Sequence, residues 1–145
     1  MRWQIALALG LLVAADCARD DAVKKEMKNL EGTWSILSLE INGTMVSEED
    51  AKKFKLETVG DKWNVTIDGN LVEATYQVDP TKDPKNIELT YAEGKFKGQP
   101  MHGIYSFVGD TLQLCRCLEP SKDRPKEFTA GADSGLVLVV WKRQQ

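Results

Sequence analysis

The chain has 145 residues, a formal net charge of −3 at pH 7 and 28% charged residues. This length fits one domain with a core of its own. The small negative charge, with no Lys/Arg cluster among aromatic residues, argues against nucleic acid or an anionic membrane surface as the main partner. Three cysteines are too few for a disulfide scaffold and leave at least one thiol unpaired.

The first fifteen residues have the pattern of a secretory signal peptide. Arg2 supplies one positive charge, and residues 5–15 form an unbroken run of apolar residues and glycine. That run is too short to span a bilayer but fits the apolar region of a signal peptide. The segment Val13-Ala14-Ala15 lies where signal peptidase needs small residues, so we expect cleavage before Asp16. A buried N-terminal helix is the alternative interpretation of the run.

Residues 16–145 are then expected to form a single exported domain, periplasmic or secreted. Cys17 stands close behind the cut, so a lipoprotein anchored to the membrane through this cysteine is an alternative. A lipobox has a small neutral residue directly before its cysteine, whereas this chain has Asp16. Simple secretion fits the sequence better, and a membrane is expected as a partner only if Cys17 is lipidated.

A short amphipathic helix is predicted over residues 20–30. Three apolar residues fall on one face of it at helical spacing: Val23, Met27 and Leu30. Gly32 then ends the helix, as a residue just past the C-cap commonly does.

The first strand is predicted over residues 34–41, which are rich in strand formers and are followed by the turn pair Asn42-Gly43. Its alternation slips once. Trp34 and Ile36 share one parity, and the other parity holds Leu37, Leu39 and Ile41. A bulge or bend near Ile36 is expected to turn both sets inward.

One small helix and a series of further strands follow. Ser47-Glu48-Glu49-Asp50 resembles a capping box and predicts one or two helical turns through Lys53. Apolar and polar residues then alternate in short segments about ten residues apart, separated by turn residues. These segments are 54–58, 63–67, 72–78, 87–91, 101–108, 112–117, a short strand from Phe128, and 136–141. Eight or nine strands with hairpin-type turns indicate an antiparallel sandwich or barrel with one buried face.

The single histidine, His102, gives little support to catalysis or metal binding. It lies on the parity opposite Met101 and Tyr105, and no Cys/His or carboxylate cluster at metal-ligand spacing is near it. The chain has no Gly-x-Ser-x-Gly elbow and no glycine-rich phosphate loop. We therefore predict no catalytic residue, no metal site and no cofactor.

Cys115-Arg116-Cys117 is the most suggestive chemical pattern. Residues i and i+2 of a strand point to one face, with Cα atoms near the upper limit for a disulfide. A bridge there would be strained and easily reduced, which suggests redox chemistry. The favoured interpretation is that these are two half-buried thiols on a strand, or that one of them pairs with Cys17.

Three residues are candidates for binding a ligand inside a barrel. Arg116 shares the parity of Leu112 and Leu114, so it points inward if they do, and a buried guanidinium needs an anionic or carbonyl partner. Tyr76 and Tyr105 share the inward parity of their strands and carry hydroxyls. The favoured alternative places Arg116 at the mouth in contact with water and the tyrosines in the core.

Gly32-Thr33-Trp34 and Arg143 resemble the hallmark pair of the lipocalin/calycin superfamily, in which an arginine from the final strand packs over the tryptophan of the first and closes the base of the barrel. Nearly the whole mature chain further resembles an uncharacterised lipocalin-like domain family that is abundant in planctomycete bacteria, often behind a signal peptide. That resemblance lies in residues 30–34, 103–105, 109–115, 124–128 and 142–143. It implies a bacterial, exported barrel and brings no established ligand or catalytic residue.

The expected fold is therefore an all-β, antiparallel, eight- or nine-stranded lipocalin-like barrel with a short N-terminal helix and one small helix after the first strand. Gly32, Trp34 and Arg143 are expected to close it. We expect a non-enzymatic protein that binds a small apolar or amphipathic ligand in the barrel, because eight-stranded barrels can hold one small ligand. The alternative is a structural or protein-interaction module of the cell envelope with a filled core.

Overall fold

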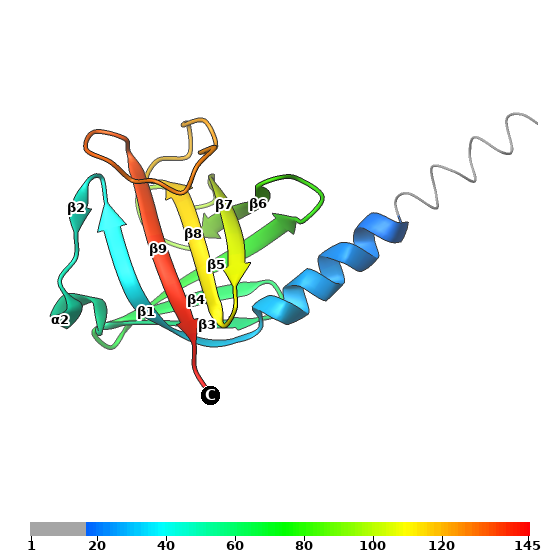
Figure 1. The fold of residues 1–145 in the computed structure, drawn as a ribbon, viewed down its shortest axis with the longest axis horizontal. Coiled ribbons are helices and arrows are strands. Elements are labelled where there is room, and N and C mark those ends of the chain that lie inside the picture. The colour runs from blue at the N-terminus through cyan, green and yellow to red at the C-terminus, as the bar shows by residue number, and fades with distance from the viewer. Residues whose placement is uncertain (1–16) are drawn as a thin grey trace, which may run out of the picture.

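The sheet closes on itself in the computed structural model, which describes residues 17–145 (Figure 1). Each strand pairs antiparallel with the next along the chain, and β1 also pairs with β9. Within the described residues this makes an eight-stranded barrel, with the two-residue strand β2 added beside β1. The elements are a helix over 17–30, β1 (Gly32–Ile41), β2 (Thr44–Met45), α2 (Glu48–Ala51), β3 (Phe54–Val59), β4 (Lys62–Ile67), β5 (Asn70–Asp79), β6 (Lys85–Tyr91), β7 (Pro100–Val108), β8 (Thr111–Cys117) and β9 (Leu136–Arg143).

Period-two alternation places one face of each strand inside the barrel. In β5 every second residue from Ala74 to Val78 is buried, and the residues between them are exposed. The same pattern in the neighbouring strands builds one continuous core, because side chains of a strand alternate between its two faces. Its largest fully buried side chains are Trp34, Trp63, Tyr76 and Tyr105. The predicted fold class is confirmed.

The irregularity predicted in the first strand is present. The register between β1 and β9 shifts between Ile36 and Ser38, so that Ile36 pairs with Trp141 and Leu39 with Val139. This bulge turns Leu39 inward, as expected. The expectation for Leu37 is wrong: this side chain is 53% exposed, because it is the bulged residue itself and points away from the core.

Both predicted helices are present with small differences in length. Helix α2 spans Glu48–Ala51, and the Ser47 hydroxyl accepts a hydrogen bond from the backbone N–H of Asp50 at 3.2 Å, as a capping serine does. The N-terminal helix is already formed at Cys17, three residues before its expected start. The predicted signal peptide and its cleavage site lie outside the described residues.

The short strand predicted from Phe128 is absent from the described chain. Residues 118–135 instead form a long loop between β8 and β9. Because β9 pairs with both β8 and β1, no strand edge remains there for a further strand to join. The loop packs on the outer face of β8, where Cys115 and Cys117 lie buried beneath it.

Candidate functional site

The barrel has two ends of different character. At the closed end lie the last turn of the N-terminal helix, the start of β1 and the end of β9 (Figure 1). At the open end lie the β4–β5 turn, the β6–β7 loop and the loop over residues 118–135. Strand register determines where along the barrel axis, between these two ends, each inward-facing residue lies.

Trp34 and Arg143 meet at the closed end. The two residues are register partners, and the Arg143 guanidinium carbon lies 4.2 Å from the centroid of the Trp34 ring. Arg143 also donates hydrogen bonds to the backbone carbonyls of Asn29 and Glu31. Trp34 donates its indole N–H to the carbonyl of Leu30 at 3.1 Å. The pair therefore fastens the end of the helix to the first and last strands.

Gly32 leaves room for this arrangement. Its φ of +140° lies in a region that L side chains rarely adopt, and a Cβ built on it would stand 2.9 Å from Nη1 of Arg143. A side chain here would strain the backbone and push the guanidinium away from the carbonyls that it binds. The three residues expected to close the barrel thus lie together.

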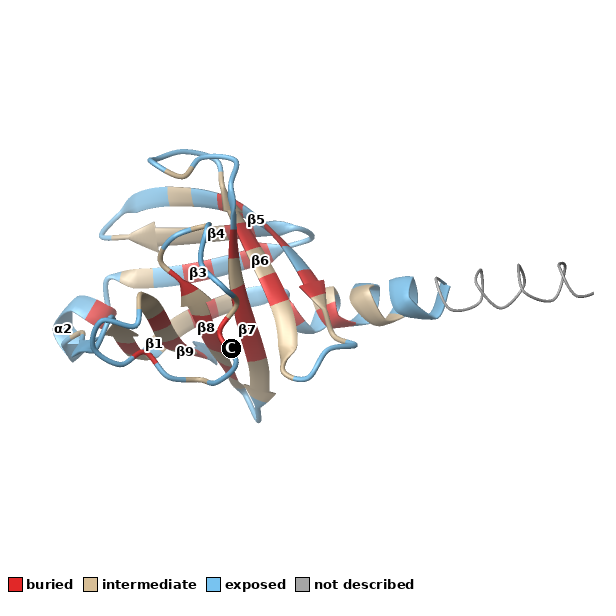
Figure 2. Ribbon diagram, turned by 90° about the horizontal axis from the view of Figure 1, so that it is seen from above, coloured by how far each residue is buried: buried red, intermediate tan, exposed pale blue. Residues whose placement is uncertain are grey.

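The helix also contributes a carboxylate to the closed end. Glu26 is 7% exposed and accepts hydrogen bonds from Lys85 at 2.7 Å and from the Tyr105 hydroxyl at 3.0 Å. Burial, and next the negative charge of Glu26, raise the pKa of Tyr105 well above its usual value. In Figure 2 the helix is exposed along its outer turns and buried where it reaches the barrel. Glu26 was not singled out from the sequence.

Neither tyrosine proposed as a ligand contact lines the interior cavity. The Tyr105 hydroxyl is bound by Glu26 at the closed end. Tyr76 packs against Trp63, with ring centroids 5.5 Å apart, and its buried hydroxyl has no partner within the described chain. Burial, with smaller contributions from Glu31 and Asp61, raises the pKa of Tyr76 to about 12. Parity predicted that both tyrosines point inward, and both are core residues.

An apolar cup of about 110 Å³ lies inside the barrel and extends from the open end toward Trp63 and Trp141. Its wall is made by seven of the eight barrel strands, all except β7. The cup is smaller than an apolar cavity of about 150 Å³, which can hold benzene. The lining residues are Ile36, Leu39, Phe54, Trp63, Val65, Ile67, Val72, Leu89, Tyr91, Leu114, Arg116, Val137, Val139 and Trp141.

Arg116 is the charged residue of this wall. It stands near the mouth, opposite Val137, and its guanidinium carbon lies 5.7 Å from the centroid of the Tyr91 ring. Nη1 donates to the carbonyl of Cys117 at 3.1 Å. No carboxylate of residues 17–145 forms an ion pair with it. Arg116 therefore faces the cup, as predicted from its parity, with an unneutralised charge.

Trp141 provides a second polar group in the cup wall. The side chain is 4% exposed, and its indole N–H has no hydrogen-bond partner among the described residues. Trp141 lies four residues from Val137 along β9, so it stands deeper in the barrel than Arg116. From the sequence Trp141 was placed in the final strand without a role, because an unpaired N–H depends on its neighbours.

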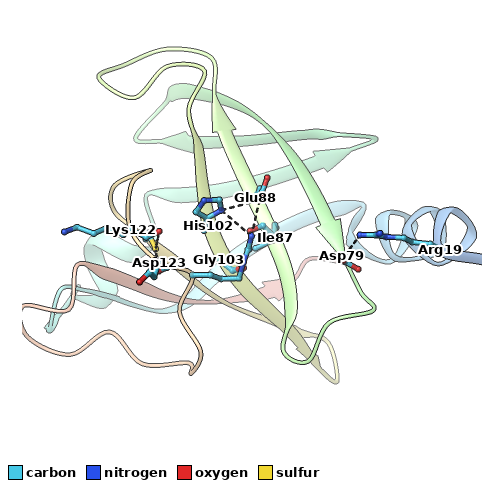
Figure 3. Close-up of polar contacts among 10 residues, drawn as sticks. Arg19, Asp79, Ile87, Glu88, His102, Gly103, Lys122 and Asp123 are labelled. Carbon is cyan, nitrogen blue, oxygen red and sulfur yellow. Dashed lines mark hydrogen bonds and ion pairs between the residues drawn. The ribbon is translucent and has the colours of Figure 1, made fainter. Parts of the chain in front are cut away.

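His102, Glu88 and Arg124 form a polar cluster on the outer face of the barrel (Figure 3). Nδ1 of His102 lies 3.3 Å from Oε1 of Glu88 and 3.3 Å from Nη2 of Arg124. Arg124 also donates to the carbonyls of Ile87 and Gly103, on β6 and β7, at 2.9 and 2.7 Å. Arg124 thereby ties the loop over 118–135 to two strands. From the sequence, Arg124 could be named only as part of a family resemblance.

The cysteines carry free thiols. Cys115 and Cys117 are buried, and their sulfur atoms lie 3.3 and 3.2 Å from the carbonyl oxygens of Thr129 and Asp123. Burial raises the pKa of each thiol, which disfavours the reactive thiolate. Cys17 is exposed. The bridges considered from the sequence, between Cys115 and Cys117 or to Cys17, are not formed. Residues 17–145 hold no group of three potential metal ligands.

Comparison of the chain with protein-family models, curated proteins and solved structures gives no match. Within residues 17–145 no helix has the length and apolarity needed to cross a bilayer. The closed barrel and the cup that opens at its open end are the features that bear on function.

Proposed function

We propose that this protein is an exported, non-enzymatic, lipocalin-like binding protein that holds a small apolar or amphipathic molecule in the cup. The apolar cavity of about 110 Å³ at the open end of a closed barrel carries this proposal. Ligand sites are typically concave and mostly apolar, with a few placed polar groups. The cup has that composition, because aliphatic and aromatic side chains surround one guanidinium.

A structural or protein-interaction module of the cell envelope is the second candidate. Four large aromatic side chains fill the core, and the cup is small beside typical ligand pockets of about 300–1,000 Å³. A barrel used only as a scaffold needs no cavity.

Binding to the purified chain tests the first proposal against the second. We expect native mass spectrometry after gentle purification to show a co-purifying small molecule, or calorimetric titration with six-carbon alcohols and acids to show saturable binding. The variant Val65→Phe fills the cup from β4 and should abolish binding. The matched control is Val59→Phe, on an exposed residue at the closed end, and should bind normally.

Both variants must keep a cooperative thermal transition for the comparison to count. Binding by Val65→Phe equal to that of the wild type would place the site elsewhere. No binding to the folded wild-type barrel would favour the envelope module.

Export is tested separately. We expect the chain, expressed with its first fifteen residues, to appear outside the cytoplasm in a shortened form that begins at Asp16. Metabolic labelling with a fatty acid distinguishes the lipoprotein alternative, since a Cys17→Ser variant would lose label only if this cysteine is lipidated. A full-length protein retained in the cytoplasm would contradict export.

A further inference from the structure

We propose that the cup selects small carboxylic acids, with the carboxylate on Arg116 at the mouth and the apolar chain extending toward Trp141. This inference rests on the proposed binding function and names the ligand class.

Arg116 differs from the other arginines of residues 17–145. Arg19 pairs with Asp79 at 2.9 Å, Arg124 pairs with Glu88 at 3.1 Å, and Arg143 binds two backbone carbonyls while lying on Trp34. Arg116 has one hydrogen bond to the carbonyl of Cys117. It is half-buried and lines an apolar cavity. A guanidinium in such a place is stabilised by an anion that shares the cavity with it.

The rest of the wall offers donors and almost no acceptor. Its side chains are aliphatic or aromatic, and its polar atoms apart from Arg116 are the indole N–H groups of Trp63 and Trp141 and the Tyr91 hydroxyl. Carboxylate and amide side chains are missing from this wall in the described structure. The buried N–H of Trp141, deeper in the cup, is a donor without a partner among the described residues. A cationic ligand would meet Arg116 with no opposing charge.

The geometry assigns an orientation to the ligand. Arg116 stands level with Val137 near the mouth, whereas Trp141 lies four residues deeper, about 13 Å along a strand. The apolar residues lie between and around them. An amphipathic acid therefore enters with its chain first and leaves the carboxylate at the guanidinium, whose planar fork matches two carboxylate oxygens. The cavity limits the enclosed chain to about the size of benzene or less.

Calorimetric titration with three ligands of equal chain length tests this directly on the wild-type protein. The probes are hexanoate, hexanol and hexylammonium at neutral pH. We expect hexanoate to bind roughly tenfold to a hundredfold more tightly than hexanol, because a hydrogen bond to a charged group adds that much when it forms away from water. Hexylammonium should bind most weakly of the three.

Variants then locate the effect. Arg116→Met keeps an unbranched side chain and removes its charge, so hexanoate should bind this variant no better than hexanol does. Arg116→Lys should retain part of the preference for the acid, since it keeps a charge without the planar fork. The matched control is Lys142→Met, which removes an exposed charge from β9 outside the cup and should keep the full preference.

The outcomes separate this inference from the proposal beneath it. Equal affinity of the wild type for hexanoate and hexanol, or unchanged hexanoate binding by a folded Arg116→Met variant, would overturn the carboxylate assignment while the binding function stands. Failure of all three probes to bind the folded wild-type chain would overturn both. The head-group comparison needs no variant, so a folding defect in Arg116→Met leaves the test decisive.

Discussion

Two arginines, one at each end of the barrel, lie against aromatic rings and differ in what else they contact. Arg143 lies 4.2 Å from the Trp34 centroid and binds the carbonyls of Asn29 and Glu31. Arg116 lies 5.7 Å from the Tyr91 centroid and binds one neighbouring carbonyl. The fold itself supplies hydrogen-bond acceptors to the Arg143 guanidinium. Arg116 faces a cavity.

The same contrast holds for the surroundings of the two residues. At the closed end Glu26, Lys85 and Tyr105 form a joined network under the helix. In the wall of the cup, Arg116 has no carboxylate partner in the described residues, and the N–H of the deeper Trp141 has no hydrogen-bond partner among them. Buried polar groups that have hydrogen-bond partners stabilise a fold. Buried polar groups without partners lower its stability, and a ligand can supply the missing partner. The contacts of Arg143 and Glu26 at the closed end therefore serve stability, and the cup with Arg116 at its mouth retains binding capacity.

Truncation of Trp34 should produce the largest loss of stability. Trp34→Ala removes a fully buried indole, its hydrogen bond to Leu30 and the surface on which Arg143 lies. We expect a loss of about 3–5 kcal/mol in the free energy of unfolding, measured by urea denaturation. Leu37→Ala, on an exposed side chain of the same strand, should change it by less than about 0.5 kcal/mol. Equal effects would remove Trp34 from its closing role.

Removal of each arginine charge compares the two ends directly. Arg143→Met leaves two carbonyls without their donor and should cost about 1–3 kcal/mol of unfolding free energy. Arg116→Met removes a charge that no acid in the described chain neutralises, so stability should stay within about 0.5 kcal/mol or rise. Urea denaturation of both variants checks this. A larger loss from Arg116→Met than from Arg143→Met would reverse the contrast between the ends.

Alkaline pH should destabilise the core through Tyr76. Its pKa is raised to about 12 in the folded protein from about 10 in the unfolded chain, so the folded state holds the proton more tightly. This contribution is complete below pH 10 and is lost as pH rises to about 12. We expect the wild type to lose roughly 1–2 kcal/mol more than Tyr76→Phe across that window.

Tyr76→Phe also serves at neutral pH, where the lost hydroxyl has no partner among the described residues. Stability there should be equal or slightly higher. Denaturation curves of both proteins at intervals from pH 9 to 12 give the comparison, and parallel pH profiles would contradict the raised pKa.

Thiol labelling should give the smallest effect, a difference in rate. Cys17 is exposed, whereas Cys115 and Cys117 are buried and burial raises the pKa of both. In the native protein with Cys17 present we expect one fast-reacting thiol and two slow ones that react when the loop over 118–135 opens. A Cys17→Ser variant should lose the fast phase. Three equally fast thiols would show that the loop does not cover Cys115 and Cys117.

The sequence predicted which residues point inward more successfully than where along the barrel axis they lie. Parity placed Tyr76, Tyr105 and Arg116 inside, but their heights depend on the register of strands paired across the sheet. Tyr105 was therefore considered as a ligand contact although it is bound at the closed end by Glu26. Glu26, between lysines on a short helix, has the local pattern of a solvent-facing acid.

The closing pair could be expected because it is carried by local motifs at the first and last strands, Gly32-Thr33-Trp34 and Arg143. The polar cluster of Arg124 with Glu88 and His102 could not, because it joins a loop to two strands distant in sequence. The strand expected from Phe128 failed for a related reason. Local composition favoured a strand, but closure of β9 on both neighbours left no partner for it.

The indole N–H resonances of an isotope-labelled sample distinguish binding in the cup from a change at the closed end, because tryptophans lie in both places. Trp63 and Trp141 line the cup, and Trp34 lies at the closed end. On titration with hexanoate, we expect the Trp141 and Trp63 resonances to move and saturate together while that of Trp34 stays in place, as binding in the cup requires. Movement of the Trp34 resonance without those of Trp141 and Trp63 would contradict it.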